Sequence, residues 1–563
     1  MAGPAAAEGA SAARLRIHDA LVGRGFVRKS DKPGSHRYEG AFAIGESSVP
    51  IVVIVDDLEF VRYPYIGIMQ GWQSNGRKLP HVLGPGGIIC YYAAGAVVLD
   101  RYDPGGTILQ CLHQAEKVLR DALAGRSDDD FAEEFRTYWG GTWQLSDLPV
   151  RYHGKGTFHV VKLSDDNSMP VLSTGESWLL DRPGSHPSPK GGEPVHVVAV
   201  NESLTLDPFA PWPPQDLAAV ASWLNWIDPR LVDDLDAALM LGTFPGGTLA
   251  LSAPNGVFSI RIALPDRFHK PEFLNSRRKS LPKLLRGMAK QVKVERSMTV
   301  AADLDYIYGR NLGSMKGLAG KRILQIGCGT IGSFLAQQLA QSGAGTGGGL
   351  LKLVDQDRLQ PSNLGRHLLG VPHLNLNKAI ASAAFLNELL PGAGVEGEDA
   401  DALALTDFDR FDLVIDATGE EALSLALNQR AVDRRPHGPD HLFVWLKGNG
   451  ALAQAILVGD PTKACFKCLK TDLSGQPRFR DLRPEVEVEV GRIQACGDAE
   501  FIPFPVSRPV SAAAMACDMV LDWANGIGGD RFRNITFDAR KAFHISNSSP
   551  GPTARCPACG MTH

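Results

Sequence analysis

The stretch Arg322-Ile-Leu-Gln-Ile-Gly327-Cys-Gly329-Thr-Ile-Gly332 joins a short apolar run to a glycine-rich turn, and apolar residues at helical spacing follow it. This order predicts a strand, a turn and a helix. Glycine permits a tight turn and a close backbone approach, and the free N–H groups at a helix start attract phosphate. We therefore predict that Gly327, Gly329 and Gly332 belong to a nucleotide site.

A second apolar run, Leu350–Val354, follows and ends in Asp355 and Asp357. A carboxylate at the end of the second strand is typical of a βαβ unit that binds a nucleotide through its ribose. These features alone predict a Rossmann-like α/β domain, and they leave NAD(P) as the default ligand.

The residues beyond this unit favour ATP over NAD(P). Asn363 and Arg366 come soon after the acidic pair, Lys378 follows, and Asp416 closes a third apolar run. Hydride transfer does not need this set of charges. Cleavage of a nucleoside triphosphate does, because cations and a carboxylate-held Mg²⁺ stabilise the negative charge that develops on the phosphates.

Together these motifs resemble the adenylating domain of ubiquitin-activating enzymes and of their bacterial ThiF-type relatives in thiamin and molybdopterin synthesis. The resemblance covers roughly residues 305–563. It implies a site in which the ribose is held by Asp355, the phosphates by Asn363, Arg366 and Lys378, and the magnesium by Asp416. It also implies that Arg310 reaches the ATP of a partner protomer, and hence a homodimer.

Two C-x-x-C pairs lie far apart in this part of the chain, Cys465 with Cys468 and Cys556 with Cys559. Four thiolates suit tetrahedral Zn²⁺, with no open position for catalysis. A redox dithiol needs only one pair and leaves the other unexplained. The spacing predicts a structural zinc that ties distant segments together, and the same arrangement recurs in the resembled family.

Cys496 lies between the two pairs, in Gln-Ala-Cys-Gly-Asp. In activating enzymes a crossover loop at this place carries the cysteine that captures the acyl adenylate, so Cys496 is the candidate thiol. A glycine-flanked loop suits a reactive thiolate better than the glycine turn around Cys328 or the predicted helix around Cys517. The alternative is a loop cysteine without a function.

The N-terminal part has a different signature. A Tyr-Pro segment at 63–64, Pro80-His81-Val82, Gly86-Gly-Ile-Ile-Cys90 and a proline turn before a helix follow one another in the order of a ubiquitin-conjugating enzyme, which this part resembles. The resemblance implies that Cys90 accepts the acyl group. The sequence lacks the usual His-Pro-Asn, so the oxyanion needs another donor, either His81 or a backbone N–H. The alternative is a buried, inert Cys90.

The composition of the chain narrows the classes of protein and of partner that remain. With 44% hydrophobic and 21% charged residues and a net charge of −4, the chain is typical of a cytoplasmic globular protein and gives no electrostatic case for nucleic acid as its main partner. We expect no signal peptide and no membrane span. Nine cysteines without a signal peptide favour metal binding or catalysis over disulfides.

These segments predict three domains: a conjugating α+β domain at 1–125, a connector at 126–300 whose fold no motif names, and a Rossmann-like ThiF-type domain at 301–563. Within the first domain we expect an unstructured alanine-rich start and then a helix at 15–25. The basic stretch 277–296 is more typical of a solvated helix face than of a site for an acidic partner.

The order resembles the fused activating and conjugating enzymes of bacterial antiphage islands, in particular those of type II CBASS, which attach a cGAS-like nucleotidyltransferase by its C-terminus. It implies that a partner protein's C-terminal carboxylate is adenylated, captured by Cys496, passed to Cys90 and joined to a lysine of a target. Alternatives are conjugation of a ubiquitin-like modifier, a sulfur-carrier adenylyltransferase that leaves Cys90 unexplained, and a noncatalytic scaffold.

Overall fold

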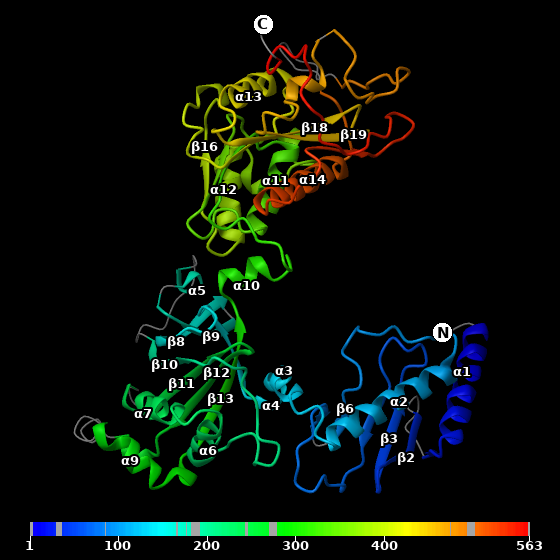
Figure 1. Ribbon diagram of the computed structural model, residues 1–563, viewed down its shortest axis with the longest axis vertical. Helices are drawn as coiled ribbons and strands as arrows, with labels where there is room; N and C mark the ends of the chain where they lie inside the picture. The colour runs from blue at the N-terminus through cyan, green and yellow to red at the C-terminus, as the bar shows by residue number, and fades with distance from the viewer. Residues whose placement is uncertain are drawn as a thin grey trace. The chain divides into compact units, whose positions relative to one another are not determined.

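The computed structural model describes residues 4–29, 36–84, 86–164, 167–175, 177–181, 192–241, 246–269, 278–472, 474–491 and 501–560 (Figure 1). The chain forms two compact units. The first contains Met1–Gly175 and His186–Ala301, and the second contains Glu176–Ser185 and Ala302–His563. None of the described helices has the length and apolar character that crossing a bilayer requires.

The first unit begins with an antiparallel sheet in the order β1-β2-β3-β4-β6-β5. Its strands are β1 (Val27–Arg28), β2 (His36–Ile44), β3 (Ser47–Val55), β4 (Tyr65–Ile68), β5 (Val82–Leu83) and β6 (Ile88–Ile89). The apolar run at the end of β3 lies between β2 and β4, as its composition predicts. Two helices, α1 (Pro4–Gly23) and α2 (Pro104–Leu123), pack on each other.

Helix α1 corrects one expectation. The alanine-rich start is helical from Pro4 and not unstructured, and the helix ends at Gly23. Alanine has the highest helix propensity of all residues, and buried Ile17 and Leu21 anchor the later turns in the core of this sheet. Alanine propensity therefore extends this helix toward the N-terminus, and the packing of Ile17 and Leu21 stabilises its C-terminal turns.

A closed barrel in the order β10-β11-β12-β13-β7-β9-β8 makes up the rest of the first unit and supplies the fold that the sequence left unnamed. Its strands are β7 (Thr142–Ser146), β8 (Gly154–Ser164), β9 (Asn167–Ser173), β10 (Glu193–Ala199), β11 (Gly246–Ala253), β12 (Gly256–Ala263) and β13 (Val294–Ala301). Helices α6 (Leu217–Ile227) and α7 (Leu231–Leu241) contribute apolar residues to its core. Of the basic stretch, the described part includes α9 (Leu281–Arg286), whose Leu281 and Leu285 are buried.

Two short helices, α3 (Asp130–Glu133) and α4 (Phe135–Trp139), precede the barrel strands. Phe131, Phe135 and Trp139 recur every four residues and are buried in the barrel core. The spacing puts these aromatic side chains on one helical face and leaves another face for polar residues.

The second unit contains a seven-stranded sheet in the order β16-β15-β14-β17-β18-β19-β20. The strands are β14 (Arg322–Ile326), β15 (Leu350–Val354), β16 (Val395–Glu398), β17 (Leu413–Asp416), β18 (Asp440–Lys447), β19 (Leu452–Val458) and β20 (Phe532–Thr536). The first five in this list pair in parallel, and β19 and β20 are antiparallel.

Helices cover both faces of this sheet (Figure 1). One core contains α11 (Thr330–Gln341), α12 (Lys378–Leu389) and α14 (Ser507–Ala524), and the other contains α13 (Glu421–Asp433). Parallel strands with helices on both faces are the predicted Rossmann-like α/β architecture. This arrangement brings the carboxyl ends of β14, β15 and β17 together, where such folds bind nucleotides.

Candidate active site

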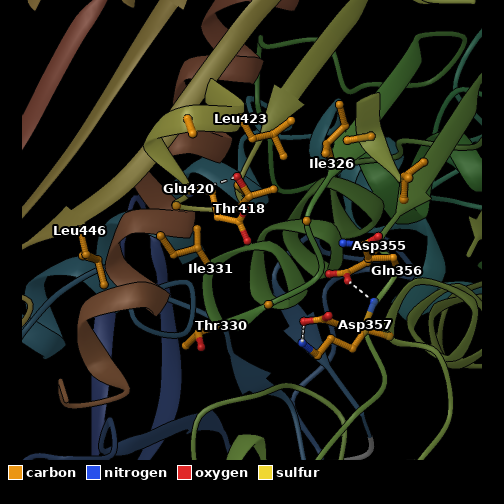
Figure 2. A pocket seen from close by; sticks show the side chains of 18 of the residues that line it. Ile326, Thr330, Ile331, Asp355, Gln356, Asp357, Thr418, Glu420, Leu423 and Leu446 are labelled. Atoms are coloured by element: carbon orange, nitrogen blue, oxygen red, sulfur yellow. Dashed lines mark hydrogen bonds and ion pairs between the residues drawn. The ribbon is translucent and has the colours of Figure 1, made fainter. Parts of the chain in front are cut away.

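A cavity of about 720 Å³ opens at the carboxyl ends of these strands (Figure 2). Its charged and polar wall includes Asp355, Gln356, Asp357, Asn363, Arg366, Lys378, Thr418, Glu420 and Asn449. An apolar wall comes from Ile326, Ile331, Val354, Ala402, Leu403 and Leu423. A cavity of this size, lined by both apolar and charged residues, matches a nucleotide, which has a flat base and an anionic tail.

The three glycines of the turn have different roles. Gly327 has φ +91°, and a Cβ there would lie 2.8 Å from the backbone N of Thr418. A Cβ at Gly332 would lie 2.0 Å from the carbonyl oxygen of Gly327, so this glycine lets α11 pack on the turn and does not line the cavity. Gly329 caps α11 and faces open space in the cavity, where a phosphate can approach the helix N-terminus.

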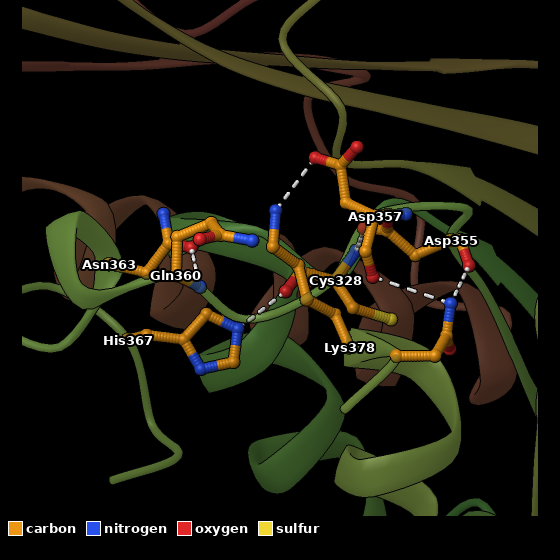
Figure 3. Close-up of polar contacts among 8 residues, drawn as sticks. Cys328, Asp355, Asp357, Gln360, Asn363, His367 and Lys378 are labelled. Atoms are coloured by element: carbon orange, nitrogen blue, oxygen red, sulfur yellow. Dashed lines mark hydrogen bonds and ion pairs between the residues drawn. The ribbon is translucent and has the colours of Figure 1, made fainter. Parts of the chain in front are cut away.

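Asp355 and Asp357 lie beside this turn (Figure 3). Asp355 accepts hydrogen bonds from the backbone N–H groups of Cys328 (2.7 Å) and Asp357 (2.8 Å), which fixes the glycine turn to the end of β15. The Asp357 carboxylate accepts a hydrogen bond from Lys378 Nζ at 2.7 Å. The lysine is buried and the aspartate is exposed, so the pair holds the ammonium at the cavity wall.

Asn363 and Arg366 reach the cavity from the segment that follows. The Asn363 side chain accepts a hydrogen bond from the Gln360 N–H (2.9 Å) and so fixes its own turn. The Arg366 guanidinium lies 5.7 Å from the centre of the Phe504 ring. Among the described residues, its buried Nε has no hydrogen-bond partner. A buried donor without an acceptor fits an anionic ligand that the polypeptide alone does not supply.

Asp416 and Arg310 are not brought to the cavity wall. Asp416 is buried, and its carboxylate accepts hydrogen bonds from the N–H and Oγ1 of Thr418 (3.0 and 2.6 Å) and from Ser424. Burial raises the pKa of Asp416, although these hydrogen bonds oppose the change. The next residues, Ala417–Gly419, do line the cavity. Arg310 is exposed at the end of α10 (Leu304–Gly309), beside Tyr306.

Sequence reasoning missed several residues at this site. His367 is buried and donates a hydrogen bond from Nε2 to the Cys328 carbonyl oxygen (2.7 Å), and burial lowers its pKa. Asn449 lies on the turn between β18 and β19 and donates to the carbonyl oxygens of Glu489 (2.9 Å) and Pro503 (3.0 Å). His367 directly follows the Arg366 motif, but no motif marks Asn449 in the sequence.

The four cysteines of the two C-x-x-C pairs do meet, and their sulfur atoms all lie within 4.8 Å of one another. Individual Sγ–Sγ distances are 3.8, 3.7 and 3.3 Å, too long for a disulfide. They approach the ~3.8 Å expected between thiolates on one tetrahedral zinc. The Asn428 side chain and the Thr553 N–H donate hydrogen bonds to two of the sulfurs, as outer groups around zinc thiolates do.

Cys90 follows β6, and its N–H donates to the carbonyl oxygen of His81 (2.8 Å) across the β5–β6 hairpin. The thiol is half-buried. Burial and then the charge of Glu134 raise the pKa of this thiol. Beside it, Tyr91 donates a hydrogen bond to the Pro64 carbonyl oxygen (2.6 Å), which fastens the Tyr-Pro segment to the Cys90 turn.

His81 cannot serve as a spare oxyanion donor in this structure. Its ring nitrogens Nδ1 and Nε2 lie 2.9 Å from Glu134 and 2.8 Å from Asp130, and its N–H donates to the Tyr138 hydroxyl at 2.8 Å. Every donor of His81 is therefore in use, and a backbone N–H remains the expected oxyanion donor. Sequence reasoning missed Asp130, Glu134 and Tyr138, although their i, i+4, i+8 spacing marks one helical face.

Cys496 lies outside the described residues. The chain on either side of it pairs, because Gly491 and Phe501 exchange both backbone hydrogen bonds (2.8 and 3.0 Å), and Ile502 and Phe504 then line the cavity. The other two candidates are buried: burial raises the pKa of Cys328 well above its ordinary value and that of Cys517 to about 11. Both are therefore poor nucleophiles.

Two family models match separate parts of the chain. Residues 307–543 match the ThiF family, and residues 12–144 match prokaryotic E2 family B. The second match continues beyond α2 and includes α3 and α4. Both predicted resemblances, to an activating and to a conjugating enzyme, are confirmed.

Relatives also match the whole chain. It is 31% identical to the ATP-dependent ubiquitin transferase-like protein Cap2 of Pseudomonas aeruginosa, over 98% of this chain and 99% of that protein. The protein of the same name from Vibrio cholerae is 27% identical over 90% of this chain and 94% of its own length. Among solved structures, Escherichia coli MccB with MccA-N7isoASN is 17% identical, with a TM-score of 0.34, over 46% of this chain and 76% of that one.

Proposed function

The chain belongs to the family of the ATP-dependent ubiquitin transferase-like protein Cap2, and from this premise we propose that it activates the C-terminal carboxylate of a partner protein with ATP and joins it to a target amine. The observation that carries the proposal is the cavity in which the glycine turn, Arg366 and Lys378 meet. A sulfur-carrier adenylyltransferase needs only the second unit, whereas the Cap2 relative matches both.

Adenylation takes place in this cavity. The partner's carboxylate attacks the α-phosphorus of ATP, a P–O bond forms to the acyl oxygen, and pyrophosphate leaves. Arg366 and Lys378 stabilise the charge that moves onto the phosphate oxygens, and the N-terminus of α11 adds its dipole. The apolar wall at Ile326, Val354 and Leu403 suits the adenine base, while each Asp355 oxygen has a lone pair left for a ribose hydroxyl.

Magnesium completes this site in the proposal. Asp416 is the proposed ligand, and it must first exchange the hydrogen bonds from Thr418 and Ser424 for the metal. Asp357 is the second candidate because its exposed carboxylate already lies at the cavity wall. When bound, Mg²⁺ supplies charge neutralisation for the pyrophosphate leaving group.

Two thiols carry the acyl group onward. The Cys496 thiolate attacks the acyl carbon of the adenylate, a thioester forms and AMP leaves. The Cys90 thiolate then attacks this thioester, and the Cys496 thiolate leaves. A target lysine finally displaces Cys90 and forms an amide. With both thiols in one chain the second transfer is intramolecular, which raises their effective concentration.

Zn²⁺ and a second protomer belong to the same proposal. Cys465, Cys468, Cys556 and Cys559 hold a structural zinc, supported by the closeness of their sulfur atoms. Arg310 acts on the ATP of the partner protomer in a homodimer, which agrees with its exposed position away from its own cavity. The activated partner is a cGAS-like nucleotidyltransferase of an antiphage island, with a ubiquitin-like modifier as the second candidate.

The order of the relay tests the proposal. With ATP and a candidate partner protein that has a free C-terminal carboxylate, Cys90→Ala should form a thiol-sensitive adduct through Cys496 but no amide product. Cys496→Ala should release pyrophosphate and form neither, because a methyl side chain cannot capture the adenylate. Non-reducing gels read beside pyrophosphate release separate these outcomes. Normal amide formation by Cys90→Ala would refute the conjugating role of the N-terminal domain.

A further inference from the structure

A polar cluster beside Cys90 combines residues of the conjugating sheet with residues of the α3–α4 segment. His81 belongs to the turn before β5, whereas Asp130 lies in α3, Tyr138 lies in α4 and Glu134 is the residue between these two helices. The residue that follows each of the last three is aromatic and buried in the barrel core: Phe131, Phe135 and Trp139. One face of this segment is therefore fixed in the barrel, and the other is presented to the Cys90 turn.

The hydrogen bonds determine the charge of this cluster. Carboxylates at neutral pH only accept hydrogen bonds, so both ring nitrogens of His81 must donate, at 2.9 Å to Glu134 and 2.8 Å to Asp130. The ring is then an imidazolium, in agreement with its pKa, which the Glu134 hydrogen bond raises to about 9. Two carboxylates and one imidazolium leave a net negative charge beside the thiol.

Glu134 is held in one position. Its Oε1 accepts from the His81 ring, and its Oε2 accepts from the Tyr138 hydroxyl at 3.1 Å. That hydroxyl in turn accepts from the backbone N–H of His81 at 2.8 Å. The His81 backbone has φ +62°, a strained left-handed value for a residue other than glycine, and the same residue accepts the Cys90 N–H. The turn that carries Cys90 and the Glu134 carboxylate are thus fixed by one network.

We propose that α3 and α4 complete the conjugating site and that the fixed carboxylate of Glu134 promotes aminolysis by stabilising the positive charge that develops on the attacking amine. The inference rests on the proposed function of Cys90. It assigns the site a preference for primary amines, such as a lysine side chain, over nucleophiles that gain no positive charge on attack, such as thiolates.

The chemistry explains why a negative charge suits this step and not the previous one. When a neutral amine attacks the Cys90 thioester, the C–N bond forms, the nitrogen becomes positive, and a nearby carboxylate lowers the energy of that state. The C–S bond then breaks, and the proton of the nitrogen passes to the departing Cys90 thiolate. Acceptance of the acyl group needs a free thiolate instead, which the same negative charge disfavours. One carboxylate should therefore have opposite effects on the two half-reactions.

The experiment measures both half-reactions in the full-length protein without its natural partner. Alkylation by iodoacetamide reports the nucleophilicity of the Cys90 thiolate. For the second half-reaction, a short peptide thioester acylates Cys90, and free lysine amide or 2-mercaptoethanol, which attacks as a thiolate, discharges it. Mass spectrometry of the Cys90 peptide follows each reaction apart from the other cysteines.

Glu134→Gln should increase the alkylation rate and decrease discharge to lysine amide by about tenfold, the equivalent of one pKa unit of charge stabilisation. Discharge to 2-mercaptoethanol should not decrease, because its thiolate gains no positive charge when it attacks. Asp130→Asn keeps Glu134 and Tyr138 and should change both rates in the same directions, but by less. Glu133→Gln is the matched control: the same substitution, one residue away at an exposed position of α3, should change neither rate.

Each other outcome overturns the inference. If both half-reactions of Glu134→Gln fall together, or both nucleophiles are affected equally, the cluster only holds the fold. If neither rate changes in a folded variant, Glu134 does not act on this site. A failure of the proposed function gives a different result: the Cys90→Ala variant would still form the amide product, with either Glu or Gln at position 134.

Discussion

The nucleotide cavity and the Cys90 site are built in contrasting ways. The cavity takes its shape from consecutive motifs on one sheet, and its polar groups are fixed largely by backbone hydrogen bonds, as the bonds from Cys328 and Asp357 to Asp355 show. The Cys90 site depends on charged side chains from a segment outside its own sheet, with His81 joining the two. A site set by local backbone geometry can be recognised from a motif, whereas one assembled from distant side chains cannot.

The zinc site gives the largest expected effect and tests whether the two sites are independent. Cys556→Ser should remove the bound zinc and lower the unfolding free energy of the second unit by several kcal/mol, since a structural metal contributes directly to folding. Metal analysis and thermal unfolding measure both. Iodoacetamide reactivity of Cys90 should not change. Full stability without zinc would contradict the four-thiolate site, and altered Cys90 reactivity would contradict independence.

Arg366 tests the charged wall of the cavity. Arg366→Ala should lower ATP–pyrophosphate exchange by about a hundredfold or more, because a cation aimed at the developing charge is lost. Arg358→Ala is the control: this arginine is exposed, donates to the Asn375 carbonyl oxygen at 2.9 Å and does not line the cavity. Equal exchange by the two variants would refute the role of Arg366. Loss of exchange in Cys90→Ala would show that adenylation depends on the Cys90 site and would contradict the independence of the two sites.

The two candidate magnesium carboxylates can be separated by the Mg²⁺ dependence of exchange. Asp416→Asn should raise the Mg²⁺ concentration for half-maximal exchange at least about tenfold, as expected when a metal ligand or its close support is lost. Asp357→Asn should raise it less, because its carboxylate is already paired with Lys378. A larger increase for Asp357→Asn than for Asp416→Asn would indicate that Asp357 is the magnesium ligand.

The smallest expected effect concerns the pH dependence of stability at the Cys90 site. Folding raises the pKa of His81 from 6.5 to about 9, mainly through the Glu134 hydrogen bond, so its contribution is complete below pH 6.5 and is lost as pH rises through about 9. After allowance for solvent screening this is about 1 kcal/mol. His81→Asn, which tolerates the left-handed backbone, should lose this pH dependence in thermal unfolding. An unchanged slope between pH 6.5 and 9 would contradict the imidazolium.

Several parts of the fold could be predicted because their physical cause is local. The glycine turn, the apolar runs that became β14, β15 and β17, and the acidic pair at Asp355 and Asp357 are each set by neighbours in the chain. The barrel could not be named because its closure depends on pairings such as β10 with β8, between segments that carry no motif. The helical start of α1 was missed because alanine gives high helix propensity but no amphipathic period.

The sequence by itself determined the nature of both sites: the strand–turn–helix with Arg366 and Lys378, the four thiols and the position of Cys90 in its motif order. Only the tertiary structure decided which groups surround them. It buried Asp416 against Thr418 and Ser424, left Arg366 Nε without a partner among the described residues, and bound Glu134 to His81, whose carbonyl oxygen accepts the Cys90 N–H. The physical reason is that burial and charge depend on everything that packs nearby, whereas a motif records only the residues adjacent in the chain.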